Sequence, residues 1–228
     1  MLTIRNARVR RVLAVVIPAV AIPAVLLVSA LLWRERYYNV VSLLIVLLAL
    51  ALFLTGFERR QTGARRLILV CVLTVLAVAG RVLPLLKPVA AITMLAGIYL
   101  GAQAGFLTGA SAALLSNFLF GQGPWTPFQM FAWGMIGLLA GCLARPLRAS
   151  RPLLLVCGAI AGIFFSLLMD VWSVLWFGGT FAWPVYAAAL VTALPHTLLY
   201  MAGNVLFLWL LAEPVGRKLT RICRKYDI

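Results

Sequence analysis

The stretch Pro88–Phe120, PVAAITMLAGIYLGAQAGFLTGASAALLSNFLF, decides how this chain is folded. It is apolar throughout, too long for one ordinary membrane span of about 20 residues and only just long enough for two. The choice between one span and two determines which of the remaining loops share a side of the membrane.

Composition places the chain in a membrane. Of its 228 residues, 64% are hydrophobic and 11% are charged, and the mean hydropathy is +1.07. Soluble domains are about 45–50% apolar and about 25% charged, so a water-soluble globular fold is excluded. Long apolar stretches must satisfy their backbone groups internally, which favours helices. We therefore expect an all-α, polytopic membrane protein.

The distribution of basic residues decides the span count. Outside Pro88–Phe120, apolar stretches long enough to cross a bilayer fall near residues 12–33, 38–56, 66–84, 125–144, 152–177 and 183–212. Two further short spans, joined by a charge-free turn near Ala102–Ala104, place most of the 20 Lys and Arg residues on one side. That side holds the N-terminus with Arg5, the loops 57–66 (with Arg59) and 145–151, and the C-terminal tail; the other keeps Arg34, Arg36, Arg81 and Lys87. Basic loops face the cytoplasm, so we predict about eight transmembrane helices with both termini cytoplasmic.

A change in polarity along the chain predicts two units. Residues 1–60 hold two spans almost without polar side chains, and Pro18 and Pro23 should kink the first of them. Residues 61–228 form spans that contain Arg, Asn, Gln, Asp, His, Tyr and Trp, followed by a basic tail. We expect an accessory N-terminal hairpin and a six-helix functional unit.

Polar side chains within spans are costly and point to function. Asp170 shares a helical face with Ser166 and Ser173, and Trp172 and Trp176 form a neighbouring stripe, together suited to an amide-bearing or flat ligand. Alternatively, Asp170 forms an ion pair with Arg81.

A second polar stripe lies in the last span. His196 is spaced with Tyr200 and Asn204 along one face, next to Pro195. It either contributes to a ligand site or donates a hydrogen bond between helices.

Two further patterns have a structural explanation beside a functional one. Thr126, Pro127 and Gln129 are typical of a helix start, with Thr126 as N-cap and Gln129 closing a capping box. Glycines spaced by four residues predict close helix packing or a surface on which a partner docks; they are Gly97, Gly101, Gly105 and Gly109.

Catalysis and nucleic-acid binding are not indicated. The sequence Gly109-Ala110-Ser111 resembles part of an intramembrane serine-protease motif, with His196 as a possible base, but the second glycine of that motif is missing. Nucleotide-binding and metalloprotease motifs are absent. The net charge of +15 is explained by loops facing anionic lipid, and the four cysteines have no metal-site or disulfide spacing. We expect neither an enzyme, a cofactor nor a nucleic-acid partner.

Four motifs carry a family resemblance: residues 96–101 (AGIYLG), 105–110 (GFLTGA), 116–130 (SNFLFGQGPWTPFQM) and 133–137 (WGMIG). Residues 66–212 resemble the substrate-binding (S) components of energy-coupling factor (ECF) vitamin transporters, with the cobalamin-type branch as the best match. The resemblance implies six helices in a bacterial cell membrane, a vitamin ligand, a transmembrane coupling subunit and two cytoplasmic ABC-type ATPases that bind ATP. The small-residue row on the first family helix is only loosely matched by Cys71, Val75 and Ala79.

By this analogy the ligand site lies in the outer half of the bundle, under the outer loops. The expected ligand-binding residues are Arg81, Asn117, Gln122, Trp125, Asp170, Trp172, Trp176 and His196. Their chemistry suits a corrinoid, which we favour, or equally a flat heterocycle such as a flavin or a deazaguanine. The rival hypothesis is a self-sufficient secondary transporter with Asp170 or His196 as a proton relay.

Overall fold

Helices form every regular element in the part of the chain that the computed structural model describes, residues 7–30, 37–55, 60–178 and 181–226. The all-α prediction is confirmed. In chain order the elements are α1 (Ala7–Val16), η1 (Ile17–Ala21), α2 (Ile22–Val28), α3 (Tyr38–Thr55), α4 (Arg60–Gly80), α5 (Val89–Leu100), α6 (Ala102–Phe120), α7 (Thr126–Cys142), α8 (Ala144–Ala149), α9 (Arg151–Gly178) and α10 (Trp183–Tyr226).

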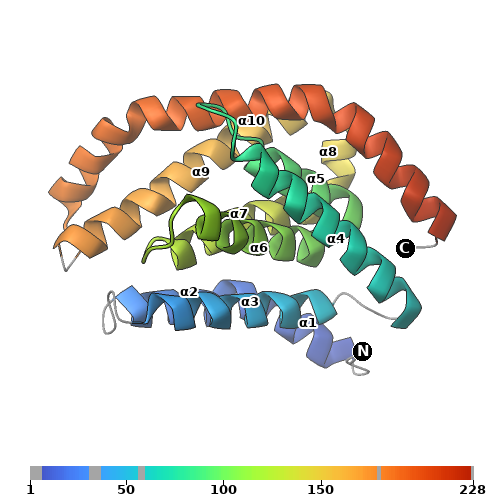
Figure 1. The fold of residues 1–228 in the computed structure, drawn as a ribbon, viewed down its shortest axis with the longest axis horizontal. Helices are drawn as coiled ribbons and strands as arrows, with labels where there is room; N and C mark the ends of the chain where they lie inside the picture. The colour runs from blue at the N-terminus through green and yellow to red at the C-terminus, as the bar shows by residue number, and fades with distance from the viewer. Residues whose placement is uncertain (1–6, 31–36, 56–59, 179–180, 227–228) are drawn as a thin grey trace.

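The helices are arranged in layers. Helices α1–α3 form one layer against α6 and α7, and α9 and α10 lie together on the opposite side (Figure 1). Helix α1 begins and α10 ends at the same end of the bundle, which we call the terminal end (Figure 1). The loops 81–88 and 121–125 follow the ends of α4 and α6 that point away from it, and we call this region the loop end. Large apolar side chains such as Val191, Leu198 and Phe118 are exposed, as expected of a surface that faces lipid.

Three helices among the described residues are long and apolar enough to cross a membrane. They cover Arg8–Val28, Arg151–Phe177 and Trp183–Tyr226, and Tyr38–Phe53 and Val89–Leu100 are shorter apolar helices. The chain is therefore a polytopic membrane protein.

The decisive stretch forms two helices, as predicted. Helix α5 ends at Leu100 and α6 begins at Ala102, with the break at Gly101 rather than at the expected turn near Ala102–Ala104. Gly101 has a φ of +97°, a conformation that side-chain-bearing residues rarely adopt, so it can end one helix and start the next without a longer loop.

Glycines bring α5 and α6 against α7 at backbone distance. A Cβ added to Gly97 or Gly105 would lie 2.0 or 2.4 Å from the carbonyl oxygen of Gly137, and one on Gly109 would lie 2.3 Å from that of Trp133. The predicted row of glycines thus packs against α7 of the same chain. Gly97, Gly105 and Gly109 are buried, and at Gly101 a Cβ would meet the Arg66 guanidinium. The close-packing alternative is thus observed, and a docking role for these glycines stays a prediction.

Helix ends differ from the expected span ends because charge marks the edge of the membrane, not the end of a helix. The predicted loop 57–66 belongs largely to α4, the loop 145–151 contains the short helix α8, and α10 continues through the basic tail to Tyr226. Arg and Lys are good helix formers, so helices extend beyond the apolar stretch. The kink expected near Pro18 takes the form of the π-helical turn η1.

Some sequence expectations have no structural test. Arg5, Arg34, Arg36 and Arg59 lie outside the described residues. The division at residue 60 stays a prediction, although α3 contacts α6 and α7 of the larger unit.

Replacing Gly105 with Ala is expected to lower the free energy of unfolding by about 1–3 kcal/mol, the usual cost of overpacking. The new Cβ would lie 2.4 Å from the Gly137 oxygen and 2.6 Å from the Gly97 Cα, and backbone atoms cannot move aside cheaply. Thermal unfolding in detergent measures the effect. Gly203→Ala is the control, since its Cβ would meet only ordinary contacts from 3.5 Å outward; equal melting temperatures for the two variants would contradict the packing argument.

Candidate functional site

Asn117 is the centre of a hydrogen-bond network at the loop end. Its Nδ2 donates to Thr126 Oγ1 at 2.8 Å and to Gln129 Oε1 at 2.9 Å, and its Oδ1 accepts from Arg81 Nη1 at 2.6 Å. Thr126 Oγ1 in turn donates to Gln122 Oε1 at 2.9 Å. Because Asn117 is only 1% exposed and its polar atoms are occupied, it joins α6, α7 and two loops rather than reaching a ligand directly.

Arg81 connects this network to an aromatic column. Besides Asn117, it donates to Ser116 Oγ at 2.5 Å, and its guanidinium lies 5.2 Å from the ring centre of Phe120 and 5.3 Å from that of Trp133. Trp133 stacks on Phe165, which contacts Tyr200 on α10. Arg81 is therefore held by hydrogen bonds and cation–π contacts from several helices.

Lys87 adds a second positive charge in the same loop. Burial and, after it, the charge of Arg81 lower the pKa of the Lys87 ammonium group. The loop 81–88 thus gathers two cations beside the network.

The capping-box prediction for α7 is wrong. Trp125 is the N-cap residue and no side chain caps the helix, while Thr126 is the first helical residue. The Thr126 and Gln129 side chains bind Asn117 instead, because the buried Asn117 amide needs hydrogen-bond partners.

Trp172, Trp176 and Trp125 form a second cluster at the loop end, and Asp170 lies two residues before Trp172 on α9. The Trp172 ring lies 6.0 Å from both the Trp176 ring, in a stacked arrangement, and the Trp125 ring, in an edge arrangement. Trp125 belongs to the same loop as Gln122, so it links this cluster to the Asn117 network. The structure thus brings together two groups of the predicted residues.

Two polar side-chain atoms of α9 lack a hydrogen-bond partner. Asp170 Oδ2 and Trp172 Nε1 are buried without a hydrogen bond. A buried polar atom without a partner costs about 1–3 kcal/mol, so such atoms call for an explanation. Trp172 offers a donor that belongs to the pair of stacked indoles, and Asp170 offers an acceptor on another face of the same helix.

The expected ion pair between Asp170 and Arg81 is not formed. Arg81 directs its guanidinium to Ser116 and Asn117, and Asp170 Oδ2 has no partner. Arg81 binds the buried Asn117 instead, and that leaves the Asp170 Oδ2 atom available.

His196 belongs to neither cluster. It is exposed on α10, whereas Asn204 on the same helix is buried and donates to the Gly158 carbonyl at 3.1 Å. Residues four apart on a helix drift by about 40° per step, so the predicted stripe turns from the outer surface into the bundle.

Sequence reasoning did not predict that Ser116, Thr126 and Gln129 complete this network. All three lie with Asn117 in the motif at residues 116–130, which was the signal that could have identified them as its partners. Within the described ranges, no three His, Cys, Asp or Glu side chains lie together as a metal site.

Substituting Leu for Asn117 is expected to destabilise the protein by about 1–3 kcal/mol or more, because Arg81, Thr126 and Gln129 would lose a buried partner at similar side-chain volume. The melting temperature in detergent is the readout. Asn39→Leu, the same exchange at an exposed position of α3, should leave it nearly unchanged. A small effect at Asn117 would show that the network is not a stabilising element.

Comparison with known proteins identifies the family. Residues 64–213 match the family described as ECF-type riboflavin transporter, S component. No curated protein and no solved structure shows a significant match. The matched region covers α4–α9 and the membrane part of α10, including both loop-end clusters, and leaves out α1–α3. The chain belongs to the family of ECF transporter S components.

Proposed function

We propose that this protein is the membrane-embedded substrate-binding subunit of an ATP-driven vitamin importer, and that its substrate is a flat heterocycle of the flavin class. Family membership supports the class of protein. The observation that carries the substrate proposal is the stacked Trp172 and Trp176 rings, together with two buried atoms of α9 that lack a partner, Trp172 Nε1 and Asp170 Oδ2.

A flavin fits this chemistry better than the corrinoid favoured from sequence. A flavin ring is planar, stacks on indoles and carries imide N–H and carbonyl groups that pair with an acceptor and a donor. A corrin ring is partly saturated and has axial ligands on its faces, so it cannot stack flat on Trp172. The family description, which names riboflavin, supports the same choice. The hypothesis of a cobalamin ligand has no such support.

The partners follow from the family. S components act with a transmembrane coupling subunit and two ATPases, and the chain itself has no nucleotide-binding motif. The positive-inside rule puts the terminal end in the cytoplasm and the loop end outside. In this orientation Arg81, Lys87 and the tryptophan cluster face the side from which a vitamin arrives.

Asp170→Asn is expected to weaken riboflavin binding at least tenfold, a loss of about 1.4 kcal/mol or more, because the neutral amide oxygen accepts from the ring imide without the charge that strengthens the hydrogen bond to a carboxylate. Quenching of flavin fluorescence by the purified protein measures the dissociation constant. An excess of cobalamin should not displace the bound riboflavin.

Glu213→Gln removes the same charge at the terminal end and should leave binding unchanged. Wild-type affinity in Asp170→Asn would overturn the role of this carboxylate. Tight binding of cobalamin in place of riboflavin would overturn the flavin proposal and retain the class of protein.

Vitamin uptake by cells that produce the chain is expected to require co-expressed ATPases with intact Walker A lysines, since only those subunits can hydrolyse ATP. Uptake of radiolabelled riboflavin with and without ATPase inactivation tests this. Uptake that continues without the ATPases and collapses with a protonophore would favour the secondary-transporter hypothesis, in which Asp170 or His196 relays protons.

A further inference from the structure

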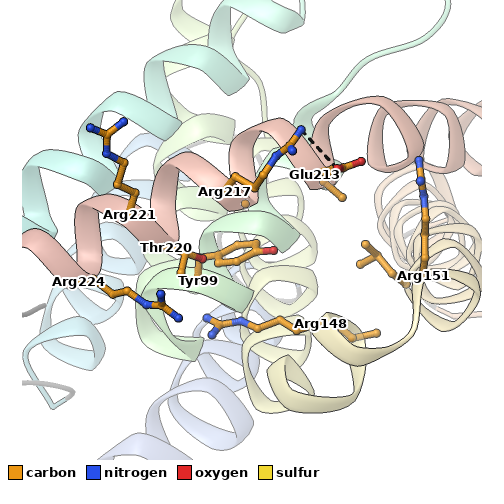
Figure 2. A pocket seen from close by; sticks show the side chains of 12 residues that line it. Tyr99, Arg148, Arg151, Glu213, Arg217, Thr220, Arg221 and Arg224 are labelled. Carbon is orange, nitrogen blue, oxygen red and sulfur yellow. Dashed lines mark ion pairs between the residues drawn. The ribbon is translucent and has the colours of Figure 1, made fainter.

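Arginines gather around a cavity at the terminal end, far from the loop-end clusters. The cavity has a volume of about 640 Å³ and lies between α5, α8, α9 and α10 (Figure 2). Its lining includes Arg148, Arg151, Arg217, Arg221 and Arg224, and among the described residues a single carboxylate, that of Glu213. A cavity with this excess of guanidinium groups favours an anionic ligand.

Tyr99 forms a rigid wall of this cavity. Its hydroxyl lies so close to Gly216 that a Cβ there would be 2.2 Å away, which places the ring against the α10 backbone. Arg148 covers the ring, with its guanidinium 4.6 Å from the ring centre, and donates to the carbonyl of Ile98. Helices α5, α8 and α10 are thus held together around the site.

The positive charges of the cavity are poorly neutralised. Glu213 pairs with Arg217 at 3.3 Å, but both side chains are largely exposed, and such pairs are weak. In the described part of the chain, Arg221 and Arg224 have no hydrogen-bond or ion-pair partner. Figure 2 shows the guanidinium groups of Arg148 and Arg224 pointing toward each other from α8 and α10. A phosphate between them would accept hydrogen bonds from both forks.

The depth of the cavity matches the headgroup region of a bilayer. Arg151 donates to the Trp209 carbonyl at 2.8 Å, and its guanidinium lies 5.7 Å from the Trp209 ring centre. Exposed Trp beside Arg is typical of the membrane–water interface. At 44 residues, α10 is longer than a bilayer span, so its arginine-bearing part extends past the hydrocarbon.

An apolar cavity adjoins the basic one. It has a volume of about 170 Å³, and its lining is entirely apolar, with Met94, Ile136, Ile160 and Phe164 among the side chains. Leu147 of α8 lines both cavities. Charged and apolar chambers that meet at one residue are suited to an amphiphile rather than to a free anion.

We propose that this is a binding site for an anionic phospholipid: Arg148 and Arg224 bind its phosphate, and an acyl chain lies against the apolar cavity beside Leu147. The proposal is independent of the transported vitamin. By holding α8 to α10, the lipid would stabilise the cytoplasmic end of the bundle.

The test is native mass spectrometry of the full-length chain with phosphatidylglycerol and with phosphatidylcholine of the same acyl chains. Wild-type protein should bind one phosphatidylglycerol about tenfold more tightly than phosphatidylcholine. Arg224→Gln should abolish this preference, because a charge-assisted fork is lost. The Arg224 side chain is exposed and unpartnered, so the variant should fold; Arg221→Gln, which should weaken binding in the same direction, serves as a second variant.

Lys218→Gln is the matched control, since it removes one positive charge from an exposed position of α10 that does not line the cavity. It should change the preference less than twofold. An equal effect of Lys218→Gln and Arg224→Gln would overturn the site in favour of general surface charge. Displacement of the lipid by an equal concentration of inorganic phosphate would overturn a lipid ligand in favour of a free phosphate.

Discussion

Backbone contact between α5, α6 and α7, made possible by glycine, is the constraint on which the rest of the molecule depends. Gly97 and Gly105 meet the Gly137 carbonyl so closely that no side chain fits between the helices. Without a hydrophobic driving force inside lipid, helices associate through such close packing and through hydrogen bonds. The contact fixes α7, and α7 then carries Gln129 and Trp133 into the loop-end network and leads to α8 at the terminal end.

The two ends of the bundle have opposite chemistry. At the loop end, Asn117 and its partners satisfy one another, and Trp125 joins this closed network to a tryptophan cluster that retains an unpartnered indole nitrogen. At the terminal end, guanidinium groups surround a cavity to which the described residues contribute a single carboxylate. The first arrangement suits an uncharged planar ligand, and the second suits an anion held at the membrane surface.

The charge of the loops led to a correct prediction of the helices, whereas depth in the membrane and local motifs did not predict which side chains pair. The two short helices in Pro88–Phe120 follow from the charge of the loops, because a single span would move two basic segments across the membrane. The pair of Asp170 with Arg81 was wrong, because depth in the membrane does not say which of several acceptors an arginine reaches. The capping box at Thr126 failed for a similar reason: buried Asn117 needed the same side chains.

The sequence by itself determined the membrane class, the helical spans and, through residues 116–130, the family, since these depend on composition and on order along the chain. The tertiary structure decided which residues meet. On α10, His196 is exposed and Asn204 is buried. The row of glycines on α5 and α6 packs against α7. The tertiary structure also gathered arginines from α8, α9 and α10 around Tyr99. Spacing along a helix fixes the face on which a side chain lies, but packing alone decides what that face contacts.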